Sequence, residues 1–320
     1  MRRTHRILLV LVVAALLLVL IPSVALAAKA PAGPVGSQAY HYLKDLATTA
    51  RVAGTPAELT AALKVKGWFA SAGYSTRLQR FSFDDGGATA RSQNVIAYRP
   101  AAVRSKNGHT PLVIVGAHYD CVDAGLGADD NASGMGVLLE VAERIAGYRQ
   151  DYDLVFVAFG AEEVGLIGGD YYFNHLSAAD VSRCTAMINF DSLIAGDFMY
   201  AHAGFNEKTW VRDRILAIAR QYRLPIKMQP GLNPSYPKGL TPDGFSDYTA
   251  FNDAGIPIVA FEATNWSIGD FDGWIQTVKH DSYWHTANDT LATIEADFPG
   301  RPMAHLKAYT KVVFEFLKGL

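Results

Sequence analysis

Histidine and acidic residues recur at the ends of apolar segments in this 320-residue chain. His118 follows the apolar run 111–116, and Asp130 stands just before an expected helix that opens near Ala132. A neutral imidazole and an ionised carboxylate are ligands that a borderline metal ion such as zinc takes from a protein. Taken alone, the same stretch is equally well explained as a strand that ends in a polar turn, followed by a helix with an Asn/Ser cap. The rest of the chain decides between these two interpretations.

Three further segments place ionisable side chains directly after apolar runs: Glu162 and Glu163 after residues 154–159, Asp191 after residues 185–190, and His285 after the last apolar run. Each has an ordinary explanation, such as a surface histidine, a turn aspartate, or glutamates favoured by a helix N-terminus. Their recurrence at successive strand ends favours a common site, because ligands of open α/β sheets bind beyond the carboxyl ends of the strands.

Four carboxylates in one pocket would repel one another and raise each other's pKa, and two divalent cations would remove that cost. The residues suit a pair of metal ions about 3.5–4 Å apart, with one histidine on each ion and a carboxylate between them. This arrangement uses His118, Asp191, Asp130 as the bridge, Glu163 and His285. Glu162 is then free to act as general base on a metal-activated water. Among the other histidines, His280 is the competitor for the position of His285.

The elements that must position these residues alternate between strand and helix. Strands are expected at residues 75–83, 92–98, 112–116, 154–159, 185–190, 198–201 and 256–261, and helices at 39–47, 58–72, 135–145, 166–175, 210–222 and 303–317. Apolar strands separated by helices predict an α/β fold with a mostly parallel mixed β-sheet sandwiched between helices.

The first 27 residues have the pattern of a secretory signal peptide. Arg2, Arg3 and Arg6 precede an unbroken apolar run at residues 7–21, and Ala25 to Ala27 offers small residues for cleavage. The alternative is an uncleaved N-terminal anchor, since the run approaches membrane-spanning length. Either way we expect an exported protein, periplasmic, secreted or on the cell surface, without stable membrane association once the signal is cleaved.

Composition bounds the class of protein. Over the full chain 50% of the residues are hydrophobic and 19% are charged, which describes a globular protein, and the near-neutral charge without basic clusters argues against nucleic-acid binding. We expect a tether at residues 28–38 and a single domain at 39–320. Cys121 and Cys184 form either one disulfide or two buried thiols, and their spacing does not choose.

The motifs around these residues resemble the zinc aminopeptidases with a co-catalytic metal pair. The matching stretches are His118-x-Asp120, Gly127 to Gly134, Ala161 to Gly165, Asn189 to Asp191, and His285-Thr286-x-x-Asp289-Thr290. A narrower resemblance, to the alkaline-phosphatase isozyme-conversion aminopeptidases of bacteria, is carried by residues 51–58, 231–239 and 261–270. Together these stretches cover the chain from about Arg51 to the last helix.

The resemblance implies a zinc-aminopeptidase or phosphorylase-hydrolase-like fold and two Zn²⁺ per chain. The zinc ligands it implies are His118, Asp130, Glu163, Asp191 and His285, with Glu162 as the base and Asp120 orienting His118. Asp130 is chosen over Asp129 because the family's bridging residue directly precedes the Asn-x-Ser-Gly segment. Residues 242–247 depart from many relatives, because they contain no tyrosine that would steady the tetrahedral intermediate.

The implied activity is the hydrolysis of N-terminal residues from peptides or proteins, with a preference for basic residues, chiefly arginine. The acidic candidates that would receive a cationic side chain are Asp243, Asp247, Glu262 and Asp270. One alternative is a glutaminyl cyclase, which uses a related fold with one zinc, and another is a non-catalytic receptor or scaffold with substituted ligands. All five ligand positions are filled here, which favours the aminopeptidase.

Overall fold

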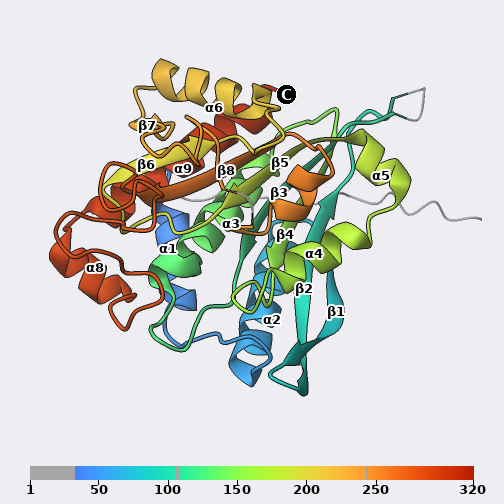
Figure 1. Cartoon of the computed structure of the whole chain (residues 1–320). Coiled ribbons are helices and arrows are strands. Elements are labelled where there is room, and N and C mark those ends of the chain that lie inside the picture. Colours follow the sequence, from blue (N-terminus) through green and yellow to red (C-terminus); the bar gives the residue numbers. More distant parts are fainter. Residues whose placement is uncertain (1–32, 106–108, 243) are drawn as a thin grey trace, which may run out of the picture.

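One eight-stranded mixed sheet runs through the structure, a computed structural model that describes residues 33–105, 109–242 and 244–320 (Figure 1). Its strand order is β1-β2-β4-β3-β5-β8-β6-β7. Four central strands run parallel: β4 (Asp153–Phe159), β3 (Leu112–His118), β5 (Cys184–Phe190) and β8 (Ile258–Thr264). They are almost continuously apolar and buried, as strands covered on both faces must be.

Antiparallel strands complete the sheet at both edges. The hairpin of β1 (Ser75–Asp85) and β2 (Ala88–Arg99) pairs with β4 on one side. On the other side β6 (Phe198–His202) pairs antiparallel with β8, and the short β7 (Ile226–Lys227) runs parallel to β6. The sheet is therefore mixed, with its parallel part in the centre.

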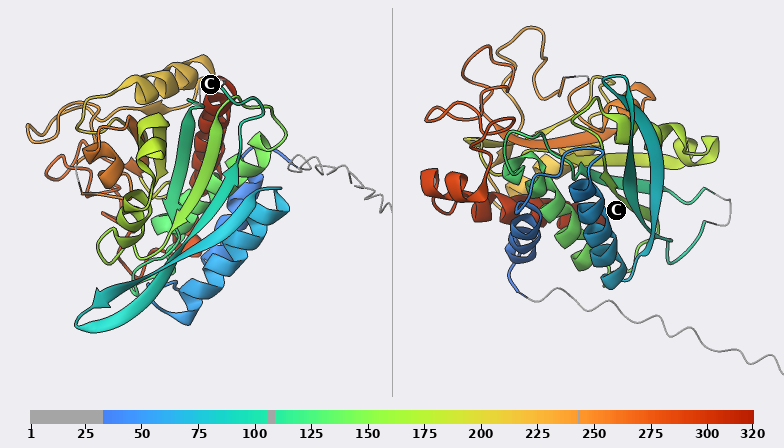
Figure 2. Two further views of the ribbon diagram at one scale, coloured as in Figure 1. Left: turned by 90° about the vertical axis from the view of Figure 1, so that its right-hand side faces the viewer. Right: turned by 90° about the horizontal axis from the view of Figure 1, so that it is seen from below.

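Helices cover both faces of the sheet (Figure 2). The larger layer contains α1 (Ser37–Leu46), α2 (Pro56–Ser71), α3 (Gly134–Ile145), α6 (Trp210–Gln221) and α9 (Arg301–Lys318). The opposite face is covered by α4 (Ile167–Asn174), α5 (Ala178–Arg183) and α7 (Thr249–Asp253). A further short helix, α8 (Leu291–Asp297), precedes α9.

The alternation of side chains along each strand builds two separate cores. In β3, Val113 and Val115 pack toward α3 and α9, whereas Ile114 packs on the other face against the cluster that contains Tyr172 and Phe251. Two packed cores hold the carboxyl ends of the central strands rigidly at one edge of the sheet.

The predicted fold class is confirmed, and each expected strand and helix has a counterpart within a few residues. The sequence did not predict the short elements α5, α7, α8 and β7. Helix α1 begins at Ser37, inside the stretch expected as a tether. The proposed signal peptide lies outside the described residues, and the domain boundaries stay a prediction. Within the described part of the chain, no helix is long and apolar enough to cross a membrane.

One buried histidine gives the fold a predicted pH dependence. His305 on α9 is 9% exposed and its Nδ1 donates to the Leu193 carbonyl at 3.0 Å. Burial lowers the pKa of His305 from 6.5 to about 4. The folded state thus keeps this ring neutral, while the unfolded chain takes up a proton below about pH 6.5. Its contribution to stability is complete above that pH and is lost progressively as the pH falls toward 4.

We expect the free energy of unfolding to drop by about 2 kcal/mol between pH 7 and pH 5 through His305 alone. His305→Gln keeps a donor for Leu193 but cannot titrate, so its unfolding energy should fall less over this range. Urea unfolding of both proteins at the two pH values measures the difference. Equal losses in the two proteins would show that His305 titrates alike in the folded and unfolded chains.

Candidate active site

The ionisable residues singled out in the sequence gather at the carboxyl edge of the parallel strands. His118 is the last residue of β3, Asp191 directly follows β5, and Glu162 and Glu163 lie three and four residues beyond β4. Asp130 belongs to the turn 128–133 that leads into α3. The topology brings these segments together because β4, β3 and β5 are neighbours in the sheet.

Five of these side chains place nitrogen and oxygen atoms close enough to one another to bind common metal ions. His118 Nε2 lies 3.2 Å from Asp130 Oδ1 and 3.2 Å from Asp191 Oδ1. His285 Nε2 lies 3.3 Å from Asp130 Oδ2 and 3.1 Å from Glu163 Oε2. Two ligands of one tetrahedral zinc ion, each about 2.0–2.2 Å from the metal, are themselves separated by about 3.3–3.5 Å. The atoms are spaced as ligands around two centres would be.

Asp130 joins the two groups because its oxygens face different histidines. Oδ1 is near His118 and Oδ2 is near His285, so the carboxylate belongs both to the group His118–Asp130–Asp191 and to the group Asp130–Glu163–His285. A carboxylate that offers one oxygen to each of two centres has the arrangement of a metal bridge.

The neighbouring Asp129 has a different environment. Its side chain is fully buried and accepts hydrogen bonds from the Ile194 and Ala195 amides and from Gln276 Nε2. It therefore anchors the turn to the loop after β5, while Asp130 faces the cavity. The family resemblance selects Asp130 over Asp129 as the bridging residue, and that assignment stays a prediction.

Asp289 holds the same turn from the other side. Its two carboxylate oxygens accept the backbone amides of Asp129 at 2.6 Å and Asp130 at 3.1 Å. Because Asp289 lies four residues after His285, it ties the segment of one histidine to the bridging carboxylate. The sequence places Asp289 in a motif with His285 but does not predict this contact.

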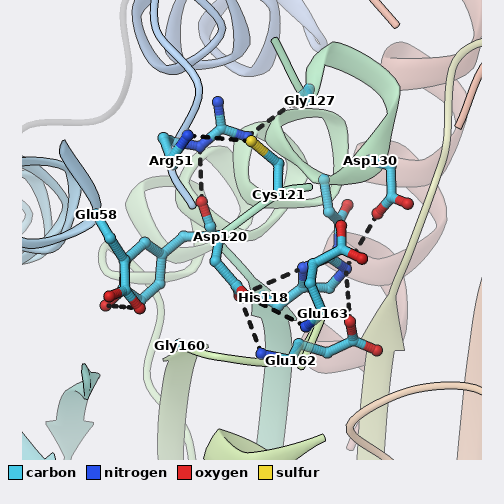
Figure 3. A network of polar contacts seen from close by, with 12 residues as sticks. Arg51, Glu58, His118, Asp120, Cys121, Gly127, Asp130, Gly160, Glu162 and Glu163 are labelled. Atoms are coloured by element: carbon cyan, nitrogen blue, oxygen red, sulfur yellow. Dashed lines mark hydrogen bonds and ion pairs between the residues drawn. The ribbon is translucent and has the colours of Figure 1, made fainter. Parts of the chain in front are cut away.

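Asp120 contacts the glutamate pair more closely than it contacts His118 (Figure 3). Its oxygens accept the amides of Glu162 and Glu163, each at 3.2 Å. The distance from Asp120 Oδ1 to His118 Nδ1 is 3.7 Å, beyond hydrogen-bonding range. The predicted orientation of His118 by Asp120 remains a prediction, whereas its contact with the glutamate loop is direct.

Arg51 holds together the loops next to the ionisable cluster through hydrogen bonds to their carbonyls. Its buried guanidinium donates to the carbonyls of Leu46, Tyr119, Leu126 and Gly127. Its amide donates to the Cys121 sulfur at 3.1 Å, so Arg51 lies against the segment that follows His118 and Asp120 (Figure 3). Cys121 and Cys184 are both buried free thiols, which answers the question that the sequence left open.

The charges of the cluster are strongly coupled. Burial, together with the charges of Asp191 and Asp247, raises the pKa of Glu162 well above its usual range although His118 opposes this. Burial and Asp130 raise the pKa of Glu163 to about 7. Hydrogen bonds to Asp130 and Glu163 raise the pKa of His285 to about 10. Without a cation, protons are thus drawn onto groups that a metal ion would need deprotonated.

A cavity of about 340 Å³ opens above these residues. His285 lies at its mouth with a side chain that is 45% exposed, whereas His118 is buried at 1%. The apolar part of the wall includes Phe245, Trp274 and Trp284. Among the described residues that line the cavity, none is lysine or arginine.

The four acidic candidates for substrate binding occupy different places. Glu262 lines the cavity. Asp247 is buried at 1% with neither oxygen hydrogen-bonded, and Asp270 is exposed, and neither is part of the cavity wall. Asp243 lies outside the described residues. The loop 242–247 contains no tyrosine, but it does supply a hydroxyl group to the site. Ser246 Oγ donates to Asp191 Oδ2 at 2.7 Å.

The donor set fits a pair of divalent metal ions. Two imidazoles and several carboxylates converge, and Glu163 Oε1 is buried without a hydrogen-bond partner, as a ligand atom would be in a metal-free chain. Nitrogen and oxygen donors in this mixture suit zinc.

Comparisons with known proteins give the chain its relatives. The model of peptidase family M28 matches residues 94–309. The chain is 32% identical to the alkaline phosphatase isozyme conversion protein of Escherichia coli strain K12 over 298 residues, covering 84% of this chain and 86% of that protein. It is also 30% identical to aminopeptidase YwaD of Bacillus subtilis strain 168 over 211 residues, which are 64% of this chain and 41% of that protein.

Solved structures show the same fold. A zinc aminopeptidase from Bacillus subtilis superposes with a TM-score of 0.71 at 19% identity, over 89% of this chain and 95% of that one. A glutaminyl cyclase from Porphyromonas gingivalis gives a TM-score of 0.68 at 19% identity, over 89% of this chain and 98% of that one. The fold alone therefore accommodates both activities.

Proposed function

The chain belongs to peptidase family M28, and on this premise we propose that it is an exported two-zinc aminopeptidase that removes N-terminal residues from peptides. Family membership and aminopeptidase relatives support a peptide hydrolase. Export is proposed from the signal-like first 27 residues. The observation that carries the finer proposal is Asp130, whose two oxygens face the two histidines.

The proposed zinc ligands are His118, Asp130 and Asp191 for one ion, and Asp130, Glu163 and His285 for the other. When bound there, the zinc ions would act as Lewis acids that polarise the scissile carbonyl and acidify the attacking water. The hydrogen bond from Ser246 would hold one oxygen of Asp191 in place, leaving the other directed at His118.

Glu162 is proposed as the general base. Its Oε2 is 3.9 Å from His118 Nε2, so it lies beside the ligands. It shares a third potential metal-binding group with His118 and Glu163 but belongs to neither of the groups that contain Asp130. Its backbone amide is fixed by Asp120. A carboxylate held here would accept the proton of the attacking water and return it to the leaving amine.

The proposed substrates are peptides or proteins with a free N-terminus, and among them those that begin with a basic residue. Support comes from the cavity wall, which has an acidic residue outside the ligand groups, Glu262, and no lysine or arginine among its described residues. A positive side chain would therefore meet no lysine or arginine on the described part of the wall.

The test uses a short peptide with an arginine N-terminus, supplied free and N-acetylated, with products read by mass spectrometry. We expect stepwise loss of the first residue from the free peptide only. Cleavage of the acetylated peptide at the same rate would contradict an aminopeptidase. A matched peptide with an N-terminal glutamine distinguishes a glutaminyl cyclase from an aminopeptidase. Cyclisation removes ammonia and leaves the chain length unchanged, whereas an aminopeptidase shortens the peptide.

A further inference from the structure

Glu262 lies beside the candidate metal centre because of the register of two strands. In the parallel pair β5 and β8, Phe190 is opposite Phe261, and the Asp191 amide donates to the Phe261 carbonyl at 3.0 Å. The residues that follow, Asp191 and Glu262, are thus neighbours across strands about 4.8 Å apart. Both line the same cavity.

The Glu262 side chain is held in place by two buried donors. His202 Nε2 lies 2.8 Å from Glu262 Oε1, and Trp266 Nε1 donates to the same oxygen. Both rings are about 1% exposed or less. The other oxygen, Oε2, has no hydrogen bond to any described residue and is not among the buried polar atoms without a partner. One oxygen is therefore used to fix the carboxylate, and the other is available to a ligand.

No lysine or arginine among the described residues forms an ion pair with Glu262, and the basic group beside it is His202. His202 contacts Glu262 Oε1 through Nε2, while its Nδ1 is buried without a hydrogen-bond partner. An anchored carboxylate with one open oxygen thus lines the cavity.

The aromatic residues of the cavity wall suit the stem of a long side chain. Phe245, Trp274 and Trp284 contribute aromatic surface, and Trp274 packs against both of the other rings. Aromatic faces attract alkyl stems and planar guanidinium groups, while a carboxylate binds the charged end.

We propose that Glu262, fixed by His202 and Trp266, is the residue that selects N-terminal residues with a cationic side chain. This inference rests on the proposed aminopeptidase function and names the residue responsible for its specificity. Of the four acidic candidates, Glu262 is the one that lines the cavity, because Asp247 and Asp270 do not and Asp243 lies outside the described residues.

A competing role for Glu262 is to bind the α-amine that every aminopeptidase substrate carries. The two roles differ in their dependence on the substrate side chain. If Glu262 binds the substrate side chain, its substitution changes the ratio of kcat/KM for an arginine substrate to kcat/KM for a neutral isostere. If Glu262 binds the α-amine, its substitution lowers both kcat/KM values equally. Citrulline is the matched isostere, since it replaces the guanidinium by an uncharged urea of the same shape.

The experiment compares kcat/KM for arginyl- and citrullyl-p-nitroanilide in the wild type, Glu262→Gln and Glu207→Gln. Glutamine keeps an oxygen for His202 and Trp266, and Glu207 is an exposed glutamate away from the cavity that serves as the matched control. We expect the wild type and the control to favour arginine by roughly 10- to 100-fold, the range for a hydrogen bond to a charged group. In Glu262→Gln this ratio should fall to about 1 with the citrulline rate retained.

Calorimetric titration with free L-arginine and L-citrulline gives a second readout that needs no turnover. Arginine should bind the wild type more tightly, and Glu262→Gln should lose that advantage. Equal losses for both substrates in Glu262→Gln would overturn the proposal and assign Glu262 to the α-amine. A wild type that does not discriminate arginine from citrulline would also overturn it, yet cleavage of either substrate would leave the aminopeptidase function intact.

Discussion

The Glu162→Gln variant is expected to lose nearly all peptide hydrolysis while retaining its zinc. Glutamine has nearly the shape of glutamate but cannot accept a proton from the attacking water, so kcat should fall by about 10²- to 10⁴-fold. The amide of residue 162 still donates to Asp120, which keeps the loop in place. Steady-state kinetics and metal analysis of the same sample measure both quantities.

Glu207→Gln is the matched control for this substitution, because Glu207 is an exposed glutamate away from the cavity. Its activity should equal that of the wild type. Full activity in Glu162→Gln would contradict the assignment of Glu162 as the general base. Loss of zinc together with activity would instead make Glu162 a ligand.

The Asp130→Ala variant is expected to lose metal from both groups at once. Its carboxylate faces His118 with one oxygen and His285 with the other, at 3.2 and 3.3 Å. Removal of both oxygens should lower the zinc content from the proposed two per chain to less than one. Hydrolysis should fall by roughly 10³-fold or more, because the metal ions supply several kcal/mol of transition-state stabilisation.

Two comparisons make this result specific to the bridge. Asp123→Ala, an exposed aspartate in the segment between β3 and the turn, should keep both zinc ions. His285→Ala removes a ligand from one group only and should keep one ion. If Asp130→Ala also kept one ion, Asp130 would be a terminal ligand of a single metal.

The positions of the chemical residues were predictable because they depend on local order along the chain. His118 and Asp191 end apolar strands, and parallel strands place their ends at one edge whatever the details of packing. The two short helices α7 and α8 were not predicted, since five and seven residues carry too little periodicity to distinguish them from turns.

The supporting contacts of the site were beyond sequence reasoning for a physical reason. Asp289 binds the amides of Asp129 and Asp130 across 160 and 159 positions of the chain, and Gln276 binds Asp129 across 147. Such pairs depend on the tertiary fold, and no spacing along the chain encodes them. For the same reason the sequence offered four acidic residues for substrate binding and could not single out Glu262.

Arg51 illustrates a motif whose meaning only the structure supplies. It opens the stretch 51–58 that resembles the narrower family, and the sequence alone assigns it no individual role. In the fold it is 2% exposed and donates to the carbonyls of Leu46, Tyr119 and Gly127, which lie before and after His118 in the chain. A buried cation bound to backbone carbonyls holds loops together, so its contribution to the site is positional.

Metal-dependent release of an N-terminal residue is the central claim, and its most direct measurement is the free-peptide assay on chelator-stripped protein. We predict that removal of metal abolishes release of the first residue and that added zinc restores it, with two zinc ions per chain at full activity. Undiminished release by protein shown to be free of metal would contradict the account.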